Sequence, residues 1–561
     1  MGSYNYYRVL GCFNRKFKIS ELQAPPDVRA AFVKYAEGAE HMTAEQLRKF
    51  LVEYQGEEAC TAASDAEAIV ATAFNRRHHL GRRFTLDDFL DFLLQDHLNA
   101  PITSQVHHDM SAPMQHYFIY TGHNSYLTGN QLSSECSEIP IIKALENGVR
   151  GIELDLWPNS TKNNIHVLHG RTLTSPVSLR KCFESIRKHA FVKSPYPVII
   201  TIEDHLTPEL QAKVAEMATQ AFGDMLYVPE SECLDEFPSP NELKHKIILS
   251  TKPPKEYLIN NKDDETSADL QENNSSEDDD KQSDEENEEM KRAPEYKRLI
   301  AIRAGNAKKG LRQALIHGSH TVSRLSLNEQ RLQRAVDLYS THLIRFTQNN
   351  ILRVFPKSTR VTSSNFKPIT CWMHGAQMVA FNMQGYGKSL WMMHGLFRSN
   401  GGCGYVKKPD LLMNKGPNEE VFDPKLTLPV KKTLKVTVYM GEGWRLDFSH
   451  THFDTYSPPD FYTKVHIVGV EADAAKKKTR IKEDDWTPYW DEEFVFPLRV
   501  PELAILRIEV RDHDTPEKGD FGGQTCLPVS ELRPGIRAVP LYDRKGHKYK
   551  SVRLLMRFQF L

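Results

Sequence analysis

Short apolar segments alternate with longer, helix-like segments through the middle of this 561-residue chain, and this alternation constrains the fold more than any other feature. An apolar run followed by an amphipathic stretch is typical of a βαβ unit, whose parallel strands are buried on both faces. The runs predict the eight strands of a closed (β/α)8 barrel of the TIM type: 116–120, 151–157, 165–168, 198–202, 246–249, 351–355, 378–382 and 404–406.

An acidic insert separates the fifth of these predicted strands from the sixth. Between Asp263 and Glu289 the sequence has 14 Asp or Glu residues and one Lys, a net charge of −13, which leaves +12 for the rest of a chain whose total is −1. Such a segment cannot bury a core, so we expect Asn260–Arg292 to be disordered. It is either a passive linker or a guard that keeps anionic surfaces from the barrel, and under the second hypothesis its deletion raises basal activity on anionic vesicles.

The two ends of the chain have different patterns. Four amphipathic stretches in the first hundred residues predict helices, and Thr43–Gln46 and Thr85–Asp88 have the composition of helix N-caps. After residue 430, short alternating segments punctuated by Pro, Gly and Asp predict an antiparallel β-sandwich. We therefore expect a multidomain chain with five parts: 1–104 (helical), 105–255 (first half-barrel), 256–296 (acidic linker), 297–429 (second half-barrel) and 430–561 (sandwich).

Cysteines and hydropathy indicate the compartment. The eight cysteines are scattered without a C-x-x-C pair, so neither a disulfide framework nor a zinc knuckle is indicated, and a reducing compartment fits best. The N-terminal residues lack the apolar core of a signal peptide. We expect a cytoplasmic protein, and the basic folded body predicts an anionic partner, either a membrane or a nucleic acid.

The C-terminal ends of the first four predicted strands carry an oxygen-rich group of side chains with two histidines. In a barrel of this kind those ends meet at one rim, where functional residues gather. Asn, Asp and Glu oxygens favour Ca²⁺ or Mg²⁺ over zinc, and carboxylates two apart on a strand share a face. Imidazoles titrate near neutrality and suit proton transfer. The group consists of His123, Asn124, Glu153, Asp155, His169 and Glu203.

These motifs resemble eukaryotic phosphoinositide-specific phospholipase C over nearly the whole chain. The order of parts, with a degenerate EF-hand-like helical region, split barrel and C2-like sandwich but no pleckstrin-homology domain, is similar to the plant-type members. The helical region lacks a D-x-[DN]-x-[DN]-G calcium loop, so we interpret it as a scaffold. The matching segments are Gly122–Leu127, Gly151–Trp157, Leu168–Gly170, Ser194–Ile199, Ile202–His205, Arg353–Pro356, Ser363–Asn365 and Gly401–Pro409.

The resemblance implies a calcium-dependent reaction on a phosphoinositide. Asn124, Glu153, Asp155 and Glu203 would bind Ca²⁺, with Glu153 or Glu203 as the base for the inositol 2-hydroxyl. His123 would stabilise the transition state. His169 would protonate the departing diacylglycerol oxygen, and water would then open the resulting cyclic phosphate. The products would be diacylglycerol and a soluble inositol phosphate, which is a role in signal transduction and lipid catabolism.

The resemblance also implies a head-group site. Lys252, Ser326 and Arg353 match positions that bind the inositol phosphates, and Phe355 matches an aromatic that stacks on the ring. A second lysine of the family, two residues before Lys252, is Ser250 here. The preference for the 4,5-bisphosphate is therefore open, and phosphatidylinositol 4-phosphate and phosphatidylinositol are also candidate substrates.

The sandwich has its own candidate calcium ligands, since a D-x-D at a strand end resembles the calcium loop of a C2 domain. Crowded carboxylates repel one another unless cations neutralise them. The basic run Lys476–Arg480 would attract an anionic leaflet. The candidates are Asp460, Asp512, Asp514 and Asp520, with Asp447 or Asp454 in the preceding loop.

Several alternatives stay open. A catalytically silent, calcium-dependent lipid adaptor and a glycerophosphodiester phosphodiesterase are the rivals, whereas no nucleic-acid-binding module is visible. Ser326 fits a helix capping box with Glu329, and nothing ties His205 to a role. We expect a monomeric protein, peripheral on the plasma membrane and without nucleic acid as a partner.

Overall fold

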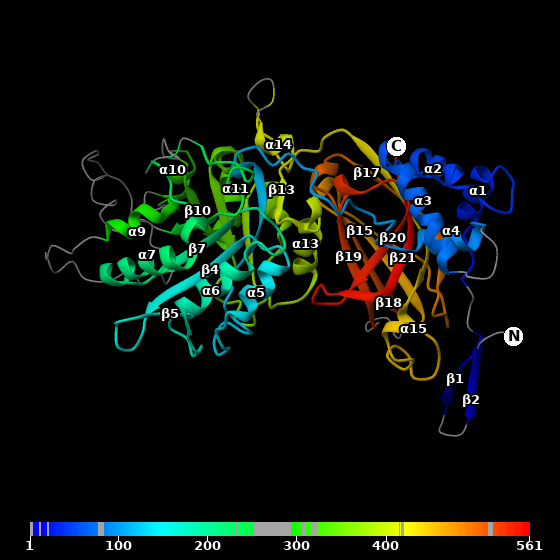
Figure 1. Ribbon diagram of the computed structural model, residues 1–561, viewed down its shortest axis with the longest axis horizontal. Helices are drawn as coiled ribbons and strands as arrows, with labels where there is room; N and C mark the ends of the chain where they lie inside the picture. The colour runs from blue at the N-terminus through cyan, green and yellow to red at the C-terminus, as the bar shows by residue number, and fades with distance from the viewer. Residues whose placement is uncertain are drawn as a thin grey trace.

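The computed structural model describes residues 4–9, 13–18, 22–76, 83–231, 234, 236–251, 293–305, 310–316, 322–414, 416, 420–513 and 520–561. The insert Asn260–Arg292, Lys252 and Asp514 therefore lie outside the described residues. Three bodies follow one another along the long axis of the molecule (Figure 1): the barrel, the sandwich and the N-terminal helices, with the helices packed on the sandwich.

Eight parallel strands form the barrel and follow one another around it in chain order. The ring closes where Ala304 bridges to Arg324 in parallel and the Gly305 N–H donates to the Arg324 carbonyl at 2.8 Å. Apolar residues on the outer face of these strands, such as Ile152 and Leu154, share one core with the surrounding helices. Residues of the inner face, such as Ile199 and Ile248, belong to a second core, so the strands are buried on both faces. The strands are β3 (Tyr117–Gly122), β4 (Gly151–Pro158), β7 (Val198–Asp204), β8 (Ile247–Thr251), β9 (Ile300–Arg303), β10 (Arg324–Asn328), β11 (Ile351–Phe355) and β12 (Met378–Phe381).

Two of the eight strands predicted from the sequence were wrong as barrel strands. The segment 165–168 forms β5 (Ile165–Val167), which pairs antiparallel with β4 and with β6 (Val177–Ser178) outside the ring. The segment 404–406 forms β13 (Tyr405–Lys407), antiparallel to β3. Their places are taken by β9 and β10, so the insert follows the fourth barrel strand, β8, rather than the fifth.

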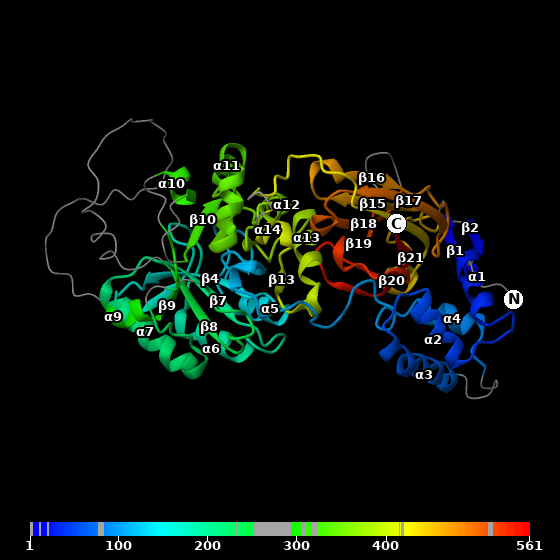
Figure 2. The same ribbon diagram turned by 90° about the horizontal axis from the view of Figure 1, so that it is seen from above.

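Helices surround the barrel and connect its strands (Figure 2). Their caps follow local rules: the Ser178 and Asn328 side chains accept the backbone N–H groups of Lys181 and Arg331, at the starts of α6 and α11. The helices are α5 (Ile139–Glu146), α6 (Leu179–His189), α7 (Pro208–Phe222), α9 (Pro294–Leu299), α10 (Leu311–Ile316), α11 (Glu329–Asn349), α12 (Ile369–Met373), α13 (Lys388–Phe397) and α14 (Asp410–Met413).

The C-terminal part is an eight-stranded antiparallel sandwich around its own core, which includes Trp444 and Trp490. The predicted strands at 434–439, 461–468, 505–510 and 552–560 are confirmed, and four more strands lie between them. The elements are β14 (Lys432–Glu442), α15 (Trp444–Asp447), β15 (Phe461–Val468), β16 (Ala475–Lys478), β17 (Tyr489–Leu498), β18 (Ile505–Asp512), β19 (Phe521–Pro528), β20 (Gly535–Tyr542) and β21 (Lys548–Phe560).

The N-terminal residues form a hairpin, β1 (Tyr4–Val9) and β2 (Phe13–Lys18), and four helices, α1 (Pro26–Tyr35), α2 (Ala44–Glu53), α3 (Ala59–Arg76) and α4 (Leu86–Leu93). Both predicted N-caps are complete capping boxes, at Thr43 and Thr85. The helices share a core with the sandwich residues Tyr439, Ile536 and Leu555. The helical region is therefore built onto the sandwich.

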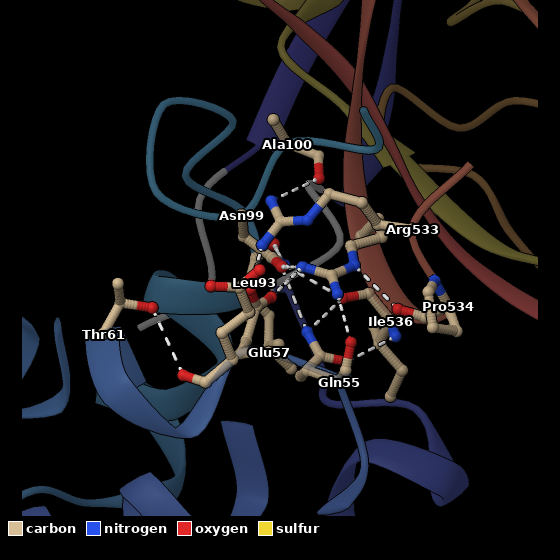
Figure 3. Close-up of polar contacts among 11 residues, drawn as sticks. Gln55, Glu57, Thr61, Leu93, Asn99, Ala100, Arg533, Pro534 and Ile536 are labelled. Atoms are coloured by element: carbon tan, nitrogen blue, oxygen red, sulfur yellow. Dashed lines mark hydrogen bonds and ion pairs between the residues drawn. The ribbon is translucent and has the colours of Figure 1, made fainter. Parts of the chain in front are cut away.

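A buried polar network fixes this contact (Figure 3). Gln55 donates to the Ile536 carbonyl at 2.6 Å and accepts from the Ile536 N–H at 2.7 Å. Glu57 forms ion pairs with Arg533 and with the buried Arg537. The Glu57 carboxylate, the two guanidinium groups and the backbone of Ile536 find their partners only in this arrangement. The orientation of the helices on the sandwich is therefore specific.

Thiols and hydropathy complete the description. The cysteines that the structure describes (Cys60, Cys136, Cys182, Cys371, Cys403 and Cys526) are free thiols. Within the described ranges, no helix has both the length and the apolar character needed to cross a membrane.

Candidate active site

Three carboxylates meet at the C-terminal rim of the barrel. Glu153 and Asp155 project from β4, and Glu203 projects from the neighbouring β7, where it lies beside Asp155 in the parallel register. One oxygen from each carboxylate lies within 4.8 Å of the others. The two-residue spacing on β4 thus places both of its carboxylates on the face predicted from the sequence.

Asp155 is the most deeply buried of the three. Its Oδ2 accepts the hydroxyl of Tyr126 at 2.7 Å, whereas its Oδ1 is buried without a hydrogen-bond partner. Burial raises the pKa of Asp155 well above its usual value, and the charges of Glu203 and Glu153 raise it further. The Oδ1 atom of this carboxylate therefore has no positively charged partner among the described residues, and a bound cation would be such a partner.

Glu153 is held by groups from both halves of the barrel. The Arg353 guanidinium on β11 forms a buried ion pair with its Oε1. The backbone N–H of Asn124 donates to its Oε2 at 3.0 Å. Asn124 adopts a left-handed conformation with φ of 42°, which non-glycine residues rarely take, and this turn aims its N–H at the carboxylate.

His123 lies against the same carboxylate. Its Nδ1 donates to the Asn382 side-chain oxygen at 3.0 Å, which leaves Nε2 facing Glu153 Oε2 at 3.9 Å. Burial lowers the pKa of His123, and the charge of Glu153 opposes this shift. The Asn382 contact therefore fixes the ring so that Nε2 is the nitrogen directed into the site.

His169 is oriented in the same manner by a backbone group. Its Nδ1 donates to the Gln131 carbonyl at 2.6 Å, so Nε2 is the nitrogen left to exchange a proton. The side chain of Gln131 bridges the site, because it accepts from Asn124 Nδ2 at 3.0 Å and donates to Asn382 Oδ1 at 3.1 Å. Both histidines are thus linked through one glutamine.

Glu203 is positioned by His205, for which the sequence indicated no role. His205 Nε2 contacts Glu203 Oε1 at 2.9 Å, and the imidazole stacks on Trp157 with ring centroids 3.8 Å apart. The hydrogen bond from His205 lowers the pKa of Glu203. Gly170 allows this stack, because a Cβ there would lie 2.0 Å from the Trp157 ring.

Comparison with known proteins identifies the family. Three descriptions match in chain order: "Phosphatidylinositol-specific phospholipase C, X domain" at residues 110–253, its "Y domain" at 300–411 and "C2 domain" at 432–543. Phosphoinositide phospholipase C 6 of Arabidopsis thaliana is 59% identical over 100% of this chain and 98% of its own. Phosphoinositide phospholipase C 2 of that plant is 54% identical over 99% of each chain.

The chain belongs to the phosphatidylinositol-specific phospholipase C family. Membership makes it an enzyme, a phosphodiesterase. The crystal structure of S. officinalis PLC21 has the same fold, with a TM-score of 0.74 and 23% identity over 96% of this chain and 68% of that one.

Three of the four predicted head-group residues of this phospholipase C lie at the rim. Ser326 on β10 is beside Arg353 in the parallel register, and its hydroxyl is buried without a hydrogen-bond partner. The alternative of a Ser326 capping box was wrong, because Ser326 lies within β10 and Asn328 caps α11. Phe355 lies parallel to the His123 ring at 6.5 Å. Lys252 lies outside the described residues.

A second buried arginine adds positive charge beneath Ser326. Arg324 Nη1 donates to Ser250 Oγ at 2.9 Å and to Thr201 Oγ1 at 3.2 Å, and burial lowers its pKa to about 9. Sequence reasoning missed it, because an arginine in a short strand is usually an exposed residue. A buried guanidinium is therefore bonded to Ser250, the position at which the resemblance implies a lysine.

Three of the four candidate C2 ligands, Asp460, Asp512 and Asp520, gather at one tip of the sandwich, and Asp514 lies outside the described residues. Asp512 Oδ1 accepts the Asp460 N–H at 2.6 Å, and the Asp512 N–H donates to the Asp520 carbonyl at 2.9 Å. Asp484, not predicted, joins them: its N–H donates to Asp460 Oδ1 at 2.7 Å, and burial together with Asp460 raises its pKa. Asp447 instead accepts backbone N–H groups of β21.

Exposed apolar side chains border the active rim and were also missed. Leu173 is 86% exposed and Tyr386 is 74% exposed. The Leu173 N–H donates to the Leu132 carbonyl at 2.8 Å, and the Gln131 N–H donates to the Val361 carbonyl at 2.9 Å. We call Leu132, Leu173, Val361 and Tyr386 the rim ridge. These residues come from four separate loops, so no local periodicity reveals them.

Proposed function

We propose that this enzyme is a calcium-dependent phospholipase C that cleaves membrane phosphoinositides to diacylglycerol and a soluble inositol phosphate. The observation that carries the proposal is the meeting of Glu153, Asp155 and Glu203 beside two histidines whose Nε2 atoms are free of backbone partners. Oxygen ligands without sulfur are the set that calcium prefers.

The donor set fits a divalent cation. Asp155 Oδ1 has no hydrogen-bond partner, and the three carboxylates repel one another, so a cation would relieve both features. Glu153, Asp155, Glu203 and the Asn124 side-chain oxygen would hold it. Bound there, calcium supplies Lewis-acid polarisation of the inositol 2-hydroxyl and charge neutralisation at the phosphate.

The protein's own groups would move the protons. A carboxylate, Glu153 or Glu203, takes the proton of the inositol 2-hydroxyl while the 2-oxygen of inositol forms a bond to phosphorus. The bond from phosphorus to the diacylglycerol oxygen breaks, and that oxygen receives a proton from His169 Nε2. His169 then accepts a proton from the water whose oxygen bonds to the phosphorus of the cyclic phosphate. The bond from phosphorus to the inositol 2-oxygen breaks, and that oxygen takes back the proton held by the carboxylate. General acid–base groups of this kind contribute roughly 10²- to 10⁴-fold in rate.

His123 would stabilise the negative charge that develops at phosphorus, and the basic side chains would bind the negative charge of the ring phosphates. His123 Nε2, directed into the site by Asn382, would stabilise the pentacoordinate phosphorus. Arg353, Ser326 and Lys252 would contact the ring phosphates, and Phe355 would pack on the ring. Arg353 is bound to Glu153 in this structure, so phosphate would compete with that carboxylate for the guanidinium.

The rim ridge supports action at a bilayer. The Leu173 N–H donates to the Leu132 carbonyl, and the carbonyl of the adjacent Gln131 accepts from His169. Insertion of these apolar side chains into a bilayer would therefore bring the rim to the head-group level. Calcium at Asp460, Asp512, Asp514 and Asp520 would bridge the sandwich tip to lipid phosphates. We propose a peripheral location on the cytoplasmic face of the plasma membrane.

The test is release of soluble inositol phosphate from mixed vesicles across a calcium titration. His123→Gln and Glu153→Gly should abolish turnover, and His123→Gln should leave vesicle binding intact. The matched control is His189→Gln, on α6 and paired with Glu146 away from the rim. Normal turnover by both rim variants, or turnover independent of calcium, would contradict the proposal.

A further inference from the structure

The hairpin β1–β2 has two faces of different composition. In its antiparallel register Tyr7 is opposite Arg15, and Phe17 follows on that side, so these three residues share an inner face. Side chains opposite one another across an antiparallel pair lie on the same face. The outer face therefore carries Tyr4, Tyr6, Arg8, Asn14, Lys16 and Lys18.

The inner face attaches the hairpin to the sandwich. Tyr7 is 1% exposed, and its hydroxyl accepts the Trp486 indole N–H at 2.9 Å. Tyr7 also makes edge contacts with Phe17 and with His450, at ring distances of 5.4 and 5.7 Å. Arg15 approaches Asp484 to 3.9 Å. The hairpin is thus held against the tip that carries the candidate C2 carboxylates.

The outer face is basic, aromatic and exposed. Tyr4 is 41% and Tyr6 is 59% exposed, and Lys16 Nζ lies 3.7 Å from the centre of the Tyr4 ring. Neither strand contains an Asp or Glu residue. Tyrosines with lysine and arginine at their edge are the composition that settles at the head-group level of a bilayer. An exposed patch with basic residues and no acidic residue in either strand attracts an anionic partner.

The hairpin lies on the side of the molecule that holds the active rim. In Figure 1 it projects at the lower edge, which it shares with α15 of the sandwich tip and with the C-terminal end of β4 beside β5. The helices α1 and α2 lie at the upper edge. A bilayer that meets the rim ridge and the sandwich tip would therefore also meet the outer face.

We propose that the outer face of this hairpin is a membrane-docking surface that binds anionic lipid without calcium, beside the calcium-requiring tip. This deepens the proposed function, because it adds a second contact with the same bilayer. Each cation near an anionic leaflet strengthens binding by about fivefold. Because Arg15 is directed toward Asp484, the outer-face lysines Lys16 and Lys18 carry the attraction.

The test is sedimentation of the full chain with phosphatidylcholine vesicles, with and without phosphatidylserine, in EGTA. Lys16→Glu with Lys18→Glu should reduce binding to the phosphatidylserine vesicles by at least about tenfold. Tyr4→Ser with Tyr6→Ser should also reduce vesicle binding, and this loss should exceed the loss that added salt causes in the wild type by screening charge. The matched control is Lys34→Glu with Lys49→Glu, two exposed lysines on α1 and α2, and it should bind as wild type does.

Equal binding of the Lys16/Lys18 variant and wild type would overturn the proposal, as would an equal loss in the Lys34/Lys49 control. A lower unfolding temperature of the Lys16/Lys18 variant would also contradict it, since the outer face would then be structural. Binding is measured without turnover. Failure of the catalytic proposal would appear as absent inositol phosphate release with normal vesicle binding, so the two failures are distinguishable.

Discussion

Arg353 and Glu153 are 200 residues apart in the chain and form a buried ion pair across the centre of the barrel. Arg353 belongs to β11 and Glu153 to β4, so the pair joins the half-barrels that precede and follow the acidic insert. The candidate cation ligands all precede the insert, and this pair ties one of them, Glu153, to the half-barrel that follows it.

Removal of this guanidinium should destabilise the calcium-free protein. Arg353→Met leaves the buried Glu153 carboxylate without its cation, which costs about 3–5 kcal/mol in unfolding free energy. Urea unfolding in EGTA measures this, with Arg180→Met on the exposed surface of α6 as control. Calcium should restore part of the loss, because it also neutralises Glu153. Equal unfolding free energies of Arg353→Met and the control would refute this prediction.

Asp155→Asn should separate calcium binding from folding. In EGTA the variant should unfold at or above the wild-type temperature, because a neutral amide replaces a carboxylate whose pKa burial raises. In calcium the wild type should gain stability and the variant should gain much less, since one ligand and one charge are lost. Calorimetry with Asp337→Asn, an exposed site on α11, provides the comparison. An undiminished calcium effect in Asp155→Asn would count against the site.

His394 should make stability fall in acid. It lies on α13 between the barrel and the sandwich, its Nδ1 accepts the Tyr120 hydroxyl at 2.5 Å, and burial lowers its pKa from 6.5 to about 4. Between these values the unfolded state binds a proton that the folded state does not, so the free energy of unfolding decreases as the pH falls. The contribution is about 3 kcal/mol.

The measurement is urea unfolding at a series of pH values for wild type and His394→Gln. The glutamine keeps an acceptor for Tyr120 but does not titrate, so the variant should lose less stability between neutral pH and the folded-state pKa. His466, whose pKa is also lowered to about 4, remains in both proteins and cancels in the difference. Parallel curves for the two proteins would be inconsistent with this assignment.

Glu57 should hold the helical region on the sandwich. Glu57→Ala leaves Arg537, which is almost completely buried, without its carboxylate, and we expect a loss of about 3 kcal/mol. Differential scanning calorimetry of the full chain should show the helical region unfolding earlier than the rest. Glu53→Gln, on the exposed side of α2, serves as control. A single unchanged transition in Glu57→Ala would argue that the apolar contact alone is sufficient.

Local pattern was sufficient for the parts of the site that depend on one strand. Glu153 and Asp155 alternate with apolar residues, so their shared face follows from the pleat of β4. The strand β10 was missed because Arg324 and Ser326 turn inward toward the polar centre and remove the apolar signal. The apolar run at 165–168 was misassigned because a short strand that pairs with the C-terminal end of β4 outside the ring also buries Ile165 and Val167.

The residues that position the site from other loops could not be predicted from the sequence, for a different reason. His205, Gln131 and Asn382 position the acid–base and carboxylate groups through contacts with other loops. Nothing in the type or spacing of these residues separates them from ordinary loop residues. The same holds for the rim ridge, which exists only once four loops meet.

The core that joins the helices to the sandwich also sets an order for synthesis. The helices α1 to α4 are synthesised before the barrel, and their buried partners Tyr439, Ile536 and Leu555 are synthesised after it. The barrel can close while the early helices still lack the surface on which they pack. During translation the apolar faces of these helices therefore stay exposed until β21 has been made, and a chaperone that binds exposed apolar surface would bind them in that interval.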